Sequence, residues 1–273
     1  MYRIIATDLD GTLLSKDHKI TEYTKNIIKF LSNHGIYFVL ASGRHYIDVM
    51  RIRDILEIDA FMITSNGSEV YNLDGTLIFK NNLYPDIAKK LCKIKCLDCN
   101  IITQLFKNDQ WYVNNTNTDN KFCPSLSSLK YNYFNVDHFD YTNISKIFFT
   151  GHDLHKLNKI EKIILSKWNT KVNISFSSSG CLEVVSKQSS KGYGLQLIAK
   201  LLNISLKDFI SFGDGMNDED MLKICGKACI MQNADLRLKM MLPNLEVIGS
   251  NDDGVAKFLN KTLIENNKNI THN

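Results

Sequence analysis

No apolar run in this sequence of 273 residues is longer than a β-strand, and Ile36–Ala41 is typical of the longest. A membrane-spanning helix needs about 20 apolar residues, so we expect no membrane partner. The apolar stretch that follows Met1 is too short for the central region of a signal peptide. These absences predict an intracellular, cytoplasmic protein.

The sequence also has little excess of one charge. It contains 33 Lys and Arg against 29 Asp and Glu, which gives a formal net charge of +4, and the lysines are scattered among acidic residues and Asn. Proteins that bind nucleic acids usually carry a clustered basic patch. We therefore do not expect nucleic acid as a partner.

The seven cysteines do not suggest a disulfide framework, because their number is odd and the expected compartment is reducing. Cys92, Cys96 and Cys99 have the spacing C-x3-C-x2-C, but no second Cys or His pair follows at the distance typical of structural zinc sites. On a helix, Cys92 and Cys96 would be small apolar neighbours. We favour that interpretation over metal binding, and we interpret Cys225 and Cys229 as structural.

The chain length corresponds to about two domains, and its 44% apolar and 23% charged residues are typical of a globular protein. Apolar strands alternate with amphipathic helices at both ends of the chain, which predicts an α/β domain with a parallel sheet. We expect strands at Tyr2–Thr7, Ile36–Ala41, Ala60–Thr64, Asp208–Phe212, Ala228–Met231 and Glu246–Ile248. We expect helices at Thr21–His34, Ile47–Glu57, Lys191–Leu202 and Glu219–Cys225, from Asp235 onward, and at the C-terminal end.

The middle of the chain has a different pattern. Asp74-Gly75 between two short apolar runs predicts a β-hairpin, and from Tyr84 the sequence is richer in aromatic residues and Asn. Here we expect an α+β unit with a helix from Tyr84 to Leu97, an antiparallel pair around Asn108-Asp109, a strand at Lys146–Thr150, a helix at Leu154–Trp168 and a strand pair within Ser175–Ser186. The sequence thus predicts a discontinuous core domain, residues 1–83 and 188–273, and an inserted domain, residues 84–187.

Polar clusters follow the expected strands or begin a helix. Asp8 and Asp10 would lie on one side of the first strand if that strand continued, and two carboxylates so close require a cation or a proton. Ser42-Gly43 offers a hydroxyl and a backbone N–H to an anion. Lys191 begins a helix, where a cation is unfavourable unless an anion lies nearby.

The last cluster is Gly213–Asp218, which adds Asp214, Asn217 and Asp218. Taken alone, each cluster has an ordinary alternative: an acidic turn, a common Ser-Gly turn, an exposed lysine, or Asp218 as the N-cap of the next helix. Together they would meet at the carboxyl edge of the sheet, which predicts a site for Mg²⁺ and a phosphate group. Neither a P-loop nor a Gly-x-Ser-x-Gly motif is present.

These clusters resemble, in order, the four motifs of the haloacid dehalogenase-like phosphatase superfamily: Asp8-Leu9-Asp10-Gly11-Thr12, Ser42, Lys191, and Gly213-Asp214 with Asn217-Asp218. The insert resembles the type IIB cap of the Cof family, and Ser42-Gly43-Arg44 and Asn66-Gly67 are also similar to that family. The resemblance implies a Rossmann-like core with a parallel sheet and an inserted α+β cap. It further implies Mg²⁺ as cofactor and hydrolysis of small phosphorylated metabolites such as pyridoxal phosphate and sugar phosphates.

The resemblance also implies a role for each residue. Asp8 would be the nucleophile that forms an aspartyl-phosphate, and Asp10 would protonate the leaving alcohol and then activate water. Asp8, Asp214 and the backbone carbonyl of Asp10 would bind Mg²⁺, while Asp218 would orient Lys191 or a metal-bound water. Phosphate would be bound by Ser42, Lys191, Asn217 and the backbone N–H groups of Leu9 and Gly43.

Other points remain open from the sequence. Glu183 could contact the leaving group or be an exposed strand residue, and Trp111 and Tyr112 could stack on a pyridoxal ring or only pack. A sugar phosphomutase and a non-catalytic sensor of phosphorylated metabolites are the alternative functions. The oligomeric state is undetermined, and the sequence is compatible with a monomer.

Overall fold

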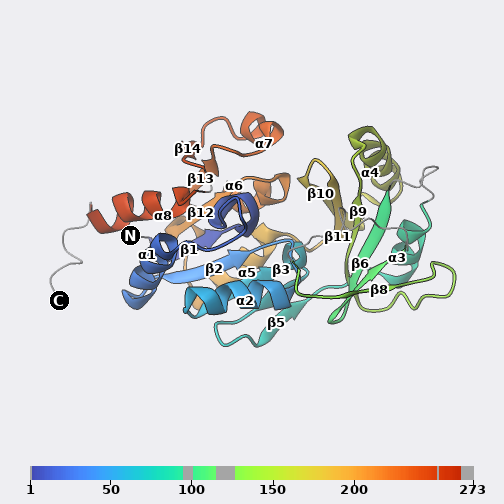
Figure 1. The fold of residues 1–273 in the computed structure, drawn as a ribbon, viewed down its shortest axis with the longest axis horizontal. Helices are drawn as coiled ribbons and strands as arrows, with labels where there is room; N and C mark the ends of the chain where they lie inside the picture. The colour runs from blue at the N-terminus through green and yellow to red at the C-terminus, as the bar shows by residue number, and fades with distance from the viewer. Residues whose placement is uncertain (1, 95–100, 115–126, 251, 266–273) are drawn as a thin grey trace.

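The computed structural model describes residues 2–94, 101–114, 127–250 and 252–265. It contains two β-sheets that lie side by side along the long axis of the molecule (Figure 1). The larger sheet takes its strands from both ends of the chain, and the smaller one takes its strands from the middle. This is the expected arrangement of an α/β core with an α+β insert, while the exact domain boundaries, 83/84 and 187/188, stay a prediction.

The larger sheet has eight strands in the order β14-β13-β12-β1-β2-β3-β4-β5. Six of them are parallel, and β4 and β5 form the antiparallel hairpin predicted at Asp74-Gly75. The strands are β1 (Ile4–Thr7), β2 (Tyr37–Ala41), β3 (Ala60–Thr64), β4 (Glu69–Tyr71), β5 (Leu77–Lys80), β12 (Phe209–Gly213), β13 (Lys227–Met231) and β14 (Glu246–Ile248). Each expected strand of the core is thus present.

Helices cover both faces of the larger sheet, as its strand sequences require. Successive side chains of a strand point to opposite faces: Ile5 packs in the cluster with α1, α2 and α8, whereas Ile4 and Ala6 pack in the cluster with α5 and α6. Both sets are buried, so the strands are apolar throughout. The helices are α1 (Glu22–Asn33), α2 (Tyr46–Leu56), α5 (Lys191–Leu202), α6 (Glu219–Ile224), α7 (Leu236–Met241) and α8 (Gly254–Leu259).

The smaller sheet has six strands in the order β10-β11-β9-β6-β7-β8. Helices cover one of its faces, and the other face carries a smaller apolar cluster around Phe106 and Phe148. Its strands are β6 (Ile102–Lys107), β7 (Gln110–Val113), β8 (Tyr131–Tyr133), β9 (Ile144–Thr150), β10 (Val172–Ser178) and β11 (Cys181–Ser186), and its helices are α3 (Pro85–Cys92) and α4 (Leu154–Trp168).

The structure differs from the sequence prediction in two elements of this insert. Helix α3 ends at Cys92 rather than near Leu97, with Lys93 as its C-cap, while Cys96 and Cys99 lie outside the described residues. Cys92 is buried among apolar side chains. Strand β8 was not predicted, and it pairs in parallel with β7.

No helix in the described ranges combines the length and the apolar composition needed to cross a membrane.

Candidate active site

The candidate site lies at the carboxyl edge of the larger sheet, where the expected polar clusters meet. Asp8 directly follows β1, Ser42 follows β2, and Asp214 follows β12. These three strands are parallel, and β1 pairs with both of the others. Their carboxyl ends therefore place residues from distant parts of the sequence together, as in other open α/β sheets.

Lys191 is the fully buried centre of this site. It begins α5, and its Nζ lies 2.6 Å from Asp8 Oδ1 and 2.6 Å from Asp218 Oδ1. Burial alone would lower the pKa of Lys191, but the charges of Asp218 and Asp8 outweigh it and raise that pKa above its ordinary value. The lysine is thus held as a cation, and the two carboxylates offset its unfavourable position at a helix start.

Asp218 organises the turn after β12. Its Oδ2 accepts hydrogen bonds from the backbone N–H groups of Asp214 at 3.0 Å and Gly215 at 2.9 Å. Asp218 occupies the N-cap position of α6, as expected, but its carboxylate makes no cap bond to that helix. The carboxylate instead faces back to this turn and to Lys191.

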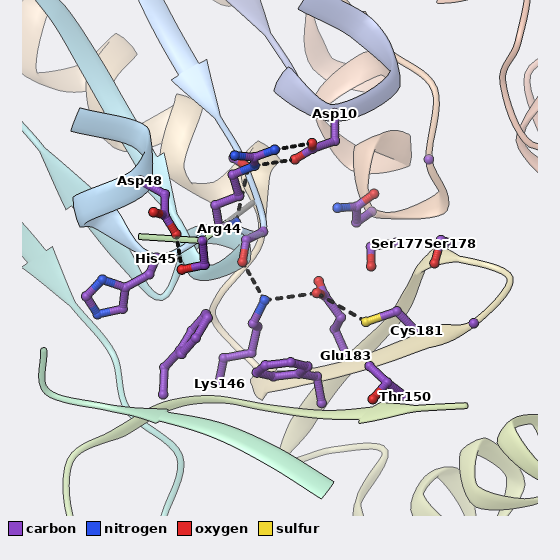
Figure 2. A pocket seen from close by; sticks show the side chains of 18 of the residues that line it. Asp10, Arg44, His45, Asp48, Lys146, Thr150, Ser177, Ser178, Cys181 and Glu183 are labelled. Atoms are coloured by element: carbon purple, nitrogen blue, oxygen red, sulfur yellow. Dashed lines mark hydrogen bonds and ion pairs between the residues drawn. The ribbon is translucent and has the colours of Figure 1, made fainter. Parts of the chain in front are cut away.

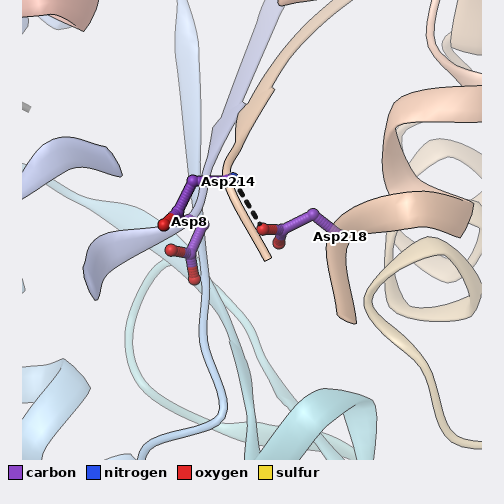
Figure 3. Close-up of side chains that lie close together, drawn as sticks. All are labelled: Asp8, Asp214 and Asp218. Carbon is purple, nitrogen blue, oxygen red and sulfur yellow. Dashed lines mark hydrogen bonds between the residues drawn. The ribbon is translucent and has the colours of Figure 1, made fainter. Parts of the chain in front are cut away.

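Three carboxylates of this site could hold a divalent cation. Ligand atoms of Asp8, Asp214 and Asp218 all lie within 4.8 Å of one another (Figure 3). Burial, reinforced by the charge of Asp218, raises the pKa of Asp214 to about 7, and burial raises the pKa of Asp8 against the attraction of Lys191. Both carboxylate oxygens of Asp218 already accept hydrogen bonds, one from Lys191 and the other from two backbone N–H groups. Asp8 and Asp214 are therefore the oxygen ligands best placed for Mg²⁺.

Asp10 lies apart from this cluster of carboxylates. The strand does not continue past Thr7, because the chain turns at Leu9–Leu13, and the Asp10 carboxylate instead accepts bonds from Arg44, with Nε to Oδ2 at 2.6 Å, and from His18 Nδ1 at 3.2 Å. Burial alone would raise the pKa of Asp10, but the hydrogen bond and charge of Arg44 lower it below its ordinary value. The strand condition under which Asp8 and Asp10 would share one side is therefore not met, although both residues line the same cavity.

The residues expected to bind phosphate surround Asp8. Ser42 is buried, and its Oγ accepts a bond from the backbone N–H of Arg44 at 3.1 Å. Asn217 Nδ2 donates to Asn66 Oδ1 at 3.1 Å. Ser42, Gly43 and Asn217 line the same cavity as Asp8, whereas Leu9 has its side chain in the core and could offer only its backbone.

That cavity has a volume of about 500 Å³ and is walled by residues of both sheets (Figure 2). Asp8, Asp10 and Asp214 belong to the wall on the larger sheet, and Phe148 and Glu183 belong to the wall on the smaller sheet. A volume of this size suits a small organic molecule. Metal and phosphate binding would take place at one end of it.

Sequence reasoning missed several residues of this site. Arg44 and Asn66 were noted only as part of the family resemblance, although Arg44 is the third residue after β2 and Asn66 the second after β3. Lys146 was not singled out, and a lysine within an apolar strand carries no signal of its own. It is 3% exposed and lies 2.9 Å from Glu183.

The structure also shows where Glu183 and the two aromatic residues, Trp111 and Tyr112, lie. Glu183 is 6% exposed and lines the cavity, so the alternative of an exposed strand residue is wrong. Trp111 lines the cavity but is 2% exposed, and its Nε1 donates to Gln104 Oε1 at 2.9 Å. Tyr112 packs edge-on against Phe139.

Comparison with known proteins identifies the class to which this chain belongs. Residues 5–259 match the family model of the haloacid dehalogenase-like hydrolases. The chain therefore belongs to this family, and the expected resemblance is confirmed. The prediction that the chain is an enzyme of the hydrolase class is confirmed as well.

Relatives in three bacteria carry the name phosphatase. The chain is 63% identical over 269 residues to a protein of Buchnera aphidicola subsp. Schizaphis graminum (strain Sg) named "Putative phosphatase", covering 98% of each chain. It is 33% identical over 264 residues to the HMP-PP phosphatase of Escherichia coli O6:H1, covering 96% of each. It is 31% identical over 265 residues to the HMP-PP phosphatase of Yersinia pseudotuberculosis serotype O:1b, again covering 96% of each.

Solved structures confirm the fold. A haloacid dehalogenase-like hydrolase from B. subtilis, 25% identical, superposes with a TM-score of 0.82 over 96% of this chain and all of that one. The HAD subclass IIB sugar phosphatase BT4131, 21% identical, gives a TM-score of 0.81 over 95% of this chain and 98% of that one. The predicted α/β core with a type IIB insert is thus the observed fold class.

Proposed function

We propose that this chain is a cytoplasmic, Mg²⁺-dependent phosphatase of small phosphorylated metabolites, with pyridoxal phosphate and sugar phosphates as its substrates. The observation that carries the proposal is the position of Lys191, 2.6 Å from both Asp8 and Asp218, with Asp214 beside them. The lysine cation, together with Mg²⁺ held by the pair of carboxylates, would stabilise a transferring phosphoryl group mainly by charge and position.

In the first step Asp8 attacks phosphorus, the bond to the leaving oxygen breaks, and Asp8 carries the phosphoryl group. Covalent catalysis of this kind divides a difficult hydrolysis into two easier steps. Lys191 keeps Asp8 in position, and Ser42, Asn217 and the backbone N–H of Gly43 bind the phosphoryl oxygens. Bound Mg²⁺ would neutralise phosphoryl charge.

Asp10 serves as the proton-transfer group. In the second step water attacks the phosphoryl group on Asp8, the bond between Asp8 and phosphorus breaks to release phosphate, and an ionised Asp10 accepts a proton from the water. The contact with Arg44 maintains this ionised form. In the first step Asp10 must be protonated, because it donates a proton to the leaving alcohol. The contact with Arg44 opposes this protonation. The two steps therefore require opposite protonation states of Asp10.

The relatives support a phosphatase, since proteins 31–63% identical to this chain carry that name. The test is to incubate the protein with Mg²⁺ and a panel that includes pyridoxal phosphate and hexose phosphates. We expect free phosphate to be released, and excess EDTA to stop the release. An isomeric sugar phosphate without free phosphate would indicate the phosphomutase instead, and binding without turnover would indicate the sensor.

A further inference from the structure

A buried ion pair lies in the wall of the cavity on the smaller sheet. Lys146 Nζ is 2.9 Å from Glu183 Oε1, and the two side chains are 4% and 7% exposed. Burying an ion pair carries a desolvation cost that its own attraction often fails to recover, and apolar residues of similar size are frequently as stable. A pair of this kind beside a cavity is therefore a candidate for binding rather than for stability.

The two strands that carry the pair direct it toward the cavity. In the antiparallel pairing of β9 with β11, Val184 lies opposite Ile147, and both pack in the cluster beneath the helices of the insert. Side chains alternate along a strand, so the preceding positions, Lys146 and Glu183, project to the opposite face. Figure 2 shows their charged groups pointing toward each other within the cavity wall.

The pair also contacts the residues proposed to bind phosphate. Lys146 Nζ donates to the backbone carbonyl of Gly43, and Asn66 Nδ2 donates to Glu183 Oε2. The same Asn66 accepts a bond from Asn217 at 3.1 Å. A continuous set of hydrogen bonds therefore joins the proposed phosphate site to the pair, and a side chain at position 43 would collide with Glu183, since its Cβ would lie 2.9 Å from Oε2.

The chemistry of the pair restricts what it can bind. A carboxylate accepts hydrogen bonds at about four positions and donates none. Among the described residues, the hydrogen bonds to Glu183 come from Lys146, Asn66 and, at a long 3.7 Å, the thiol of Cys181. Glu183 thus has acceptor capacity for a ligand, but its charge repels phosphate oxygens, so the group it accepts must come from another part of the ligand.

We propose that Lys146 and Glu183 form the subsite for the alcohol part of the substrate, and that Glu183 selects phosphate esters whose alcohol carries a hydroxyl or N–H donor. This inference rests on the proposed phosphatase function and adds the class of alcohol. Lys146 is fixed between the rings of Phe106 and Phe148, 4.9 and 4.8 Å from their centroids. From there it offsets the charge of Glu183 and donates to an oxygen of the alcohol.

The test measures binding without turnover. Calorimetry in EDTA compares glucose 6-phosphate with cyclohexylmethyl phosphate, which has a six-membered ring and a phosphate but no hydroxyl. The variants are Glu183→Gln and a matched control, Glu69→Gln. Glu69 is also a buried carboxylate paired with a lysine, at 2.9 Å from Lys80, whose side chain is 31% exposed, but Glu69 does not line this cavity.

We expect the wild-type protein to prefer glucose 6-phosphate, and Glu183→Gln to reduce that preference about 10- to 100-fold, the usual range for a lost hydrogen bond to a charged group. Glu69→Gln should leave the preference within about twofold. Glu183→Asp, which keeps the charge and shortens the side chain by one methylene, should also reduce the preference if the Gln variant does not fold.

A wild-type protein that binds both probes equally, or a preference that survives in both Glu183 variants, would overturn the inference. Equal weakening of both probes would do so as well, because it would indicate a general effect on the site. Phosphate release with Mg²⁺ is a separate readout: selective binding through Glu183 without any release would refute the phosphatase and keep the subsite.

Discussion

At the scale of single residues, the candidate active site brings together more negative than positive charge. Asp8, Asp214 and Asp218 bring three carboxylates together, and Lys191 supplies a fully buried cation that contacts two of them. Burial, reinforced by the charge of Asp218, raises the pKa of Asp214 to about 7. The negative charge that Lys191 leaves uncompensated favours a bound divalent cation here.

Lys191→Met tests this balance. Removing one partner of a buried charge cluster leaves the others uncompensated, which typically costs about 3–5 kcal/mol of the free energy of unfolding. We expect a loss of this size in the free energy of unfolding, and urea unfolding would show it as a lower midpoint concentration of urea.

Lys16→Met is the matched control, because the Lys16–Asp252 pair is largely exposed. An exposed pair contributes at most about 1 kcal/mol. If the two variants unfold at the same urea concentration, Lys191 does not hold the carboxylates together as described.

At the scale of elements, the start of α5 is held in place by the turn after β3. That turn, Ser65–Gly67, ends in Gly67 at φ +85°, and a Cβ there would lie 2.1 Å from the backbone oxygen of Ser190. Ser190 is the N-cap of α5 and directly precedes Lys191. The close approach of this turn therefore fixes the position of Lys191.

Gly67→Ala should destabilise the protein by about 3 kcal/mol or more, because it adds a backbone collision to the strain of a positive φ. The comparison is Gly35→Ala, at φ +82° with nothing within 4 Å of the added carbon, which should cost about 1–2 kcal/mol. Thermal and urea unfolding of both variants measure the difference. Similar losses in the two variants would show that the contact with Ser190 is unimportant.

The sequence predicted elements well where the local pattern decides them. The strands of the core are short apolar runs, and their helices carry apolar residues at helical spacing. The strand expected at Tyr2–Thr7 is therefore found at Ile4–Thr7, and the helix expected at Thr21–His34 is found at Glu22–Asn33. Strand β8, Tyr131–Tyr133, was missed because its three residues have no pattern of their own and become a strand only by pairing with β7. The bond of Asp10 to Arg44 was not predicted, because it depends on the turn at Leu9–Leu13 and on where the tertiary structure places Arg44.

At the scale of the whole molecule, the site is assembled from segments that only the tertiary structure brings together. The motifs around Asp8, Ser42, Lys191 and Asp214 were recognisable because polar residues at the ends of parallel strands converge by the rules of the fold. Lys146 could not be found in this way, since its place in the wall depends on how the smaller sheet lies against the larger one.

The arrangement of the two sheets also gives the cavity two chemically different ends. One end is lined by carboxylates, of which Asp8 is paired with Lys191, and the other holds the Lys146–Glu183 pair and aromatic rings. We therefore assign reaction at phosphorus to the larger sheet and recognition of the alcohol to the smaller sheet.

The measurement that tests the central claim most directly is Mg²⁺-dependent release of phosphate from a hexose phosphate by the wild-type protein and by Asp8→Asn. Asn preserves the shape of the side chain but cannot attack phosphorus, so we expect the rate to fall by about 1,000-fold or more while the fold, followed by thermal unfolding, is retained. An Asp8→Asn protein that released phosphate within about tenfold of the wild-type rate would contradict the assignment of Asp8 as the nucleophile.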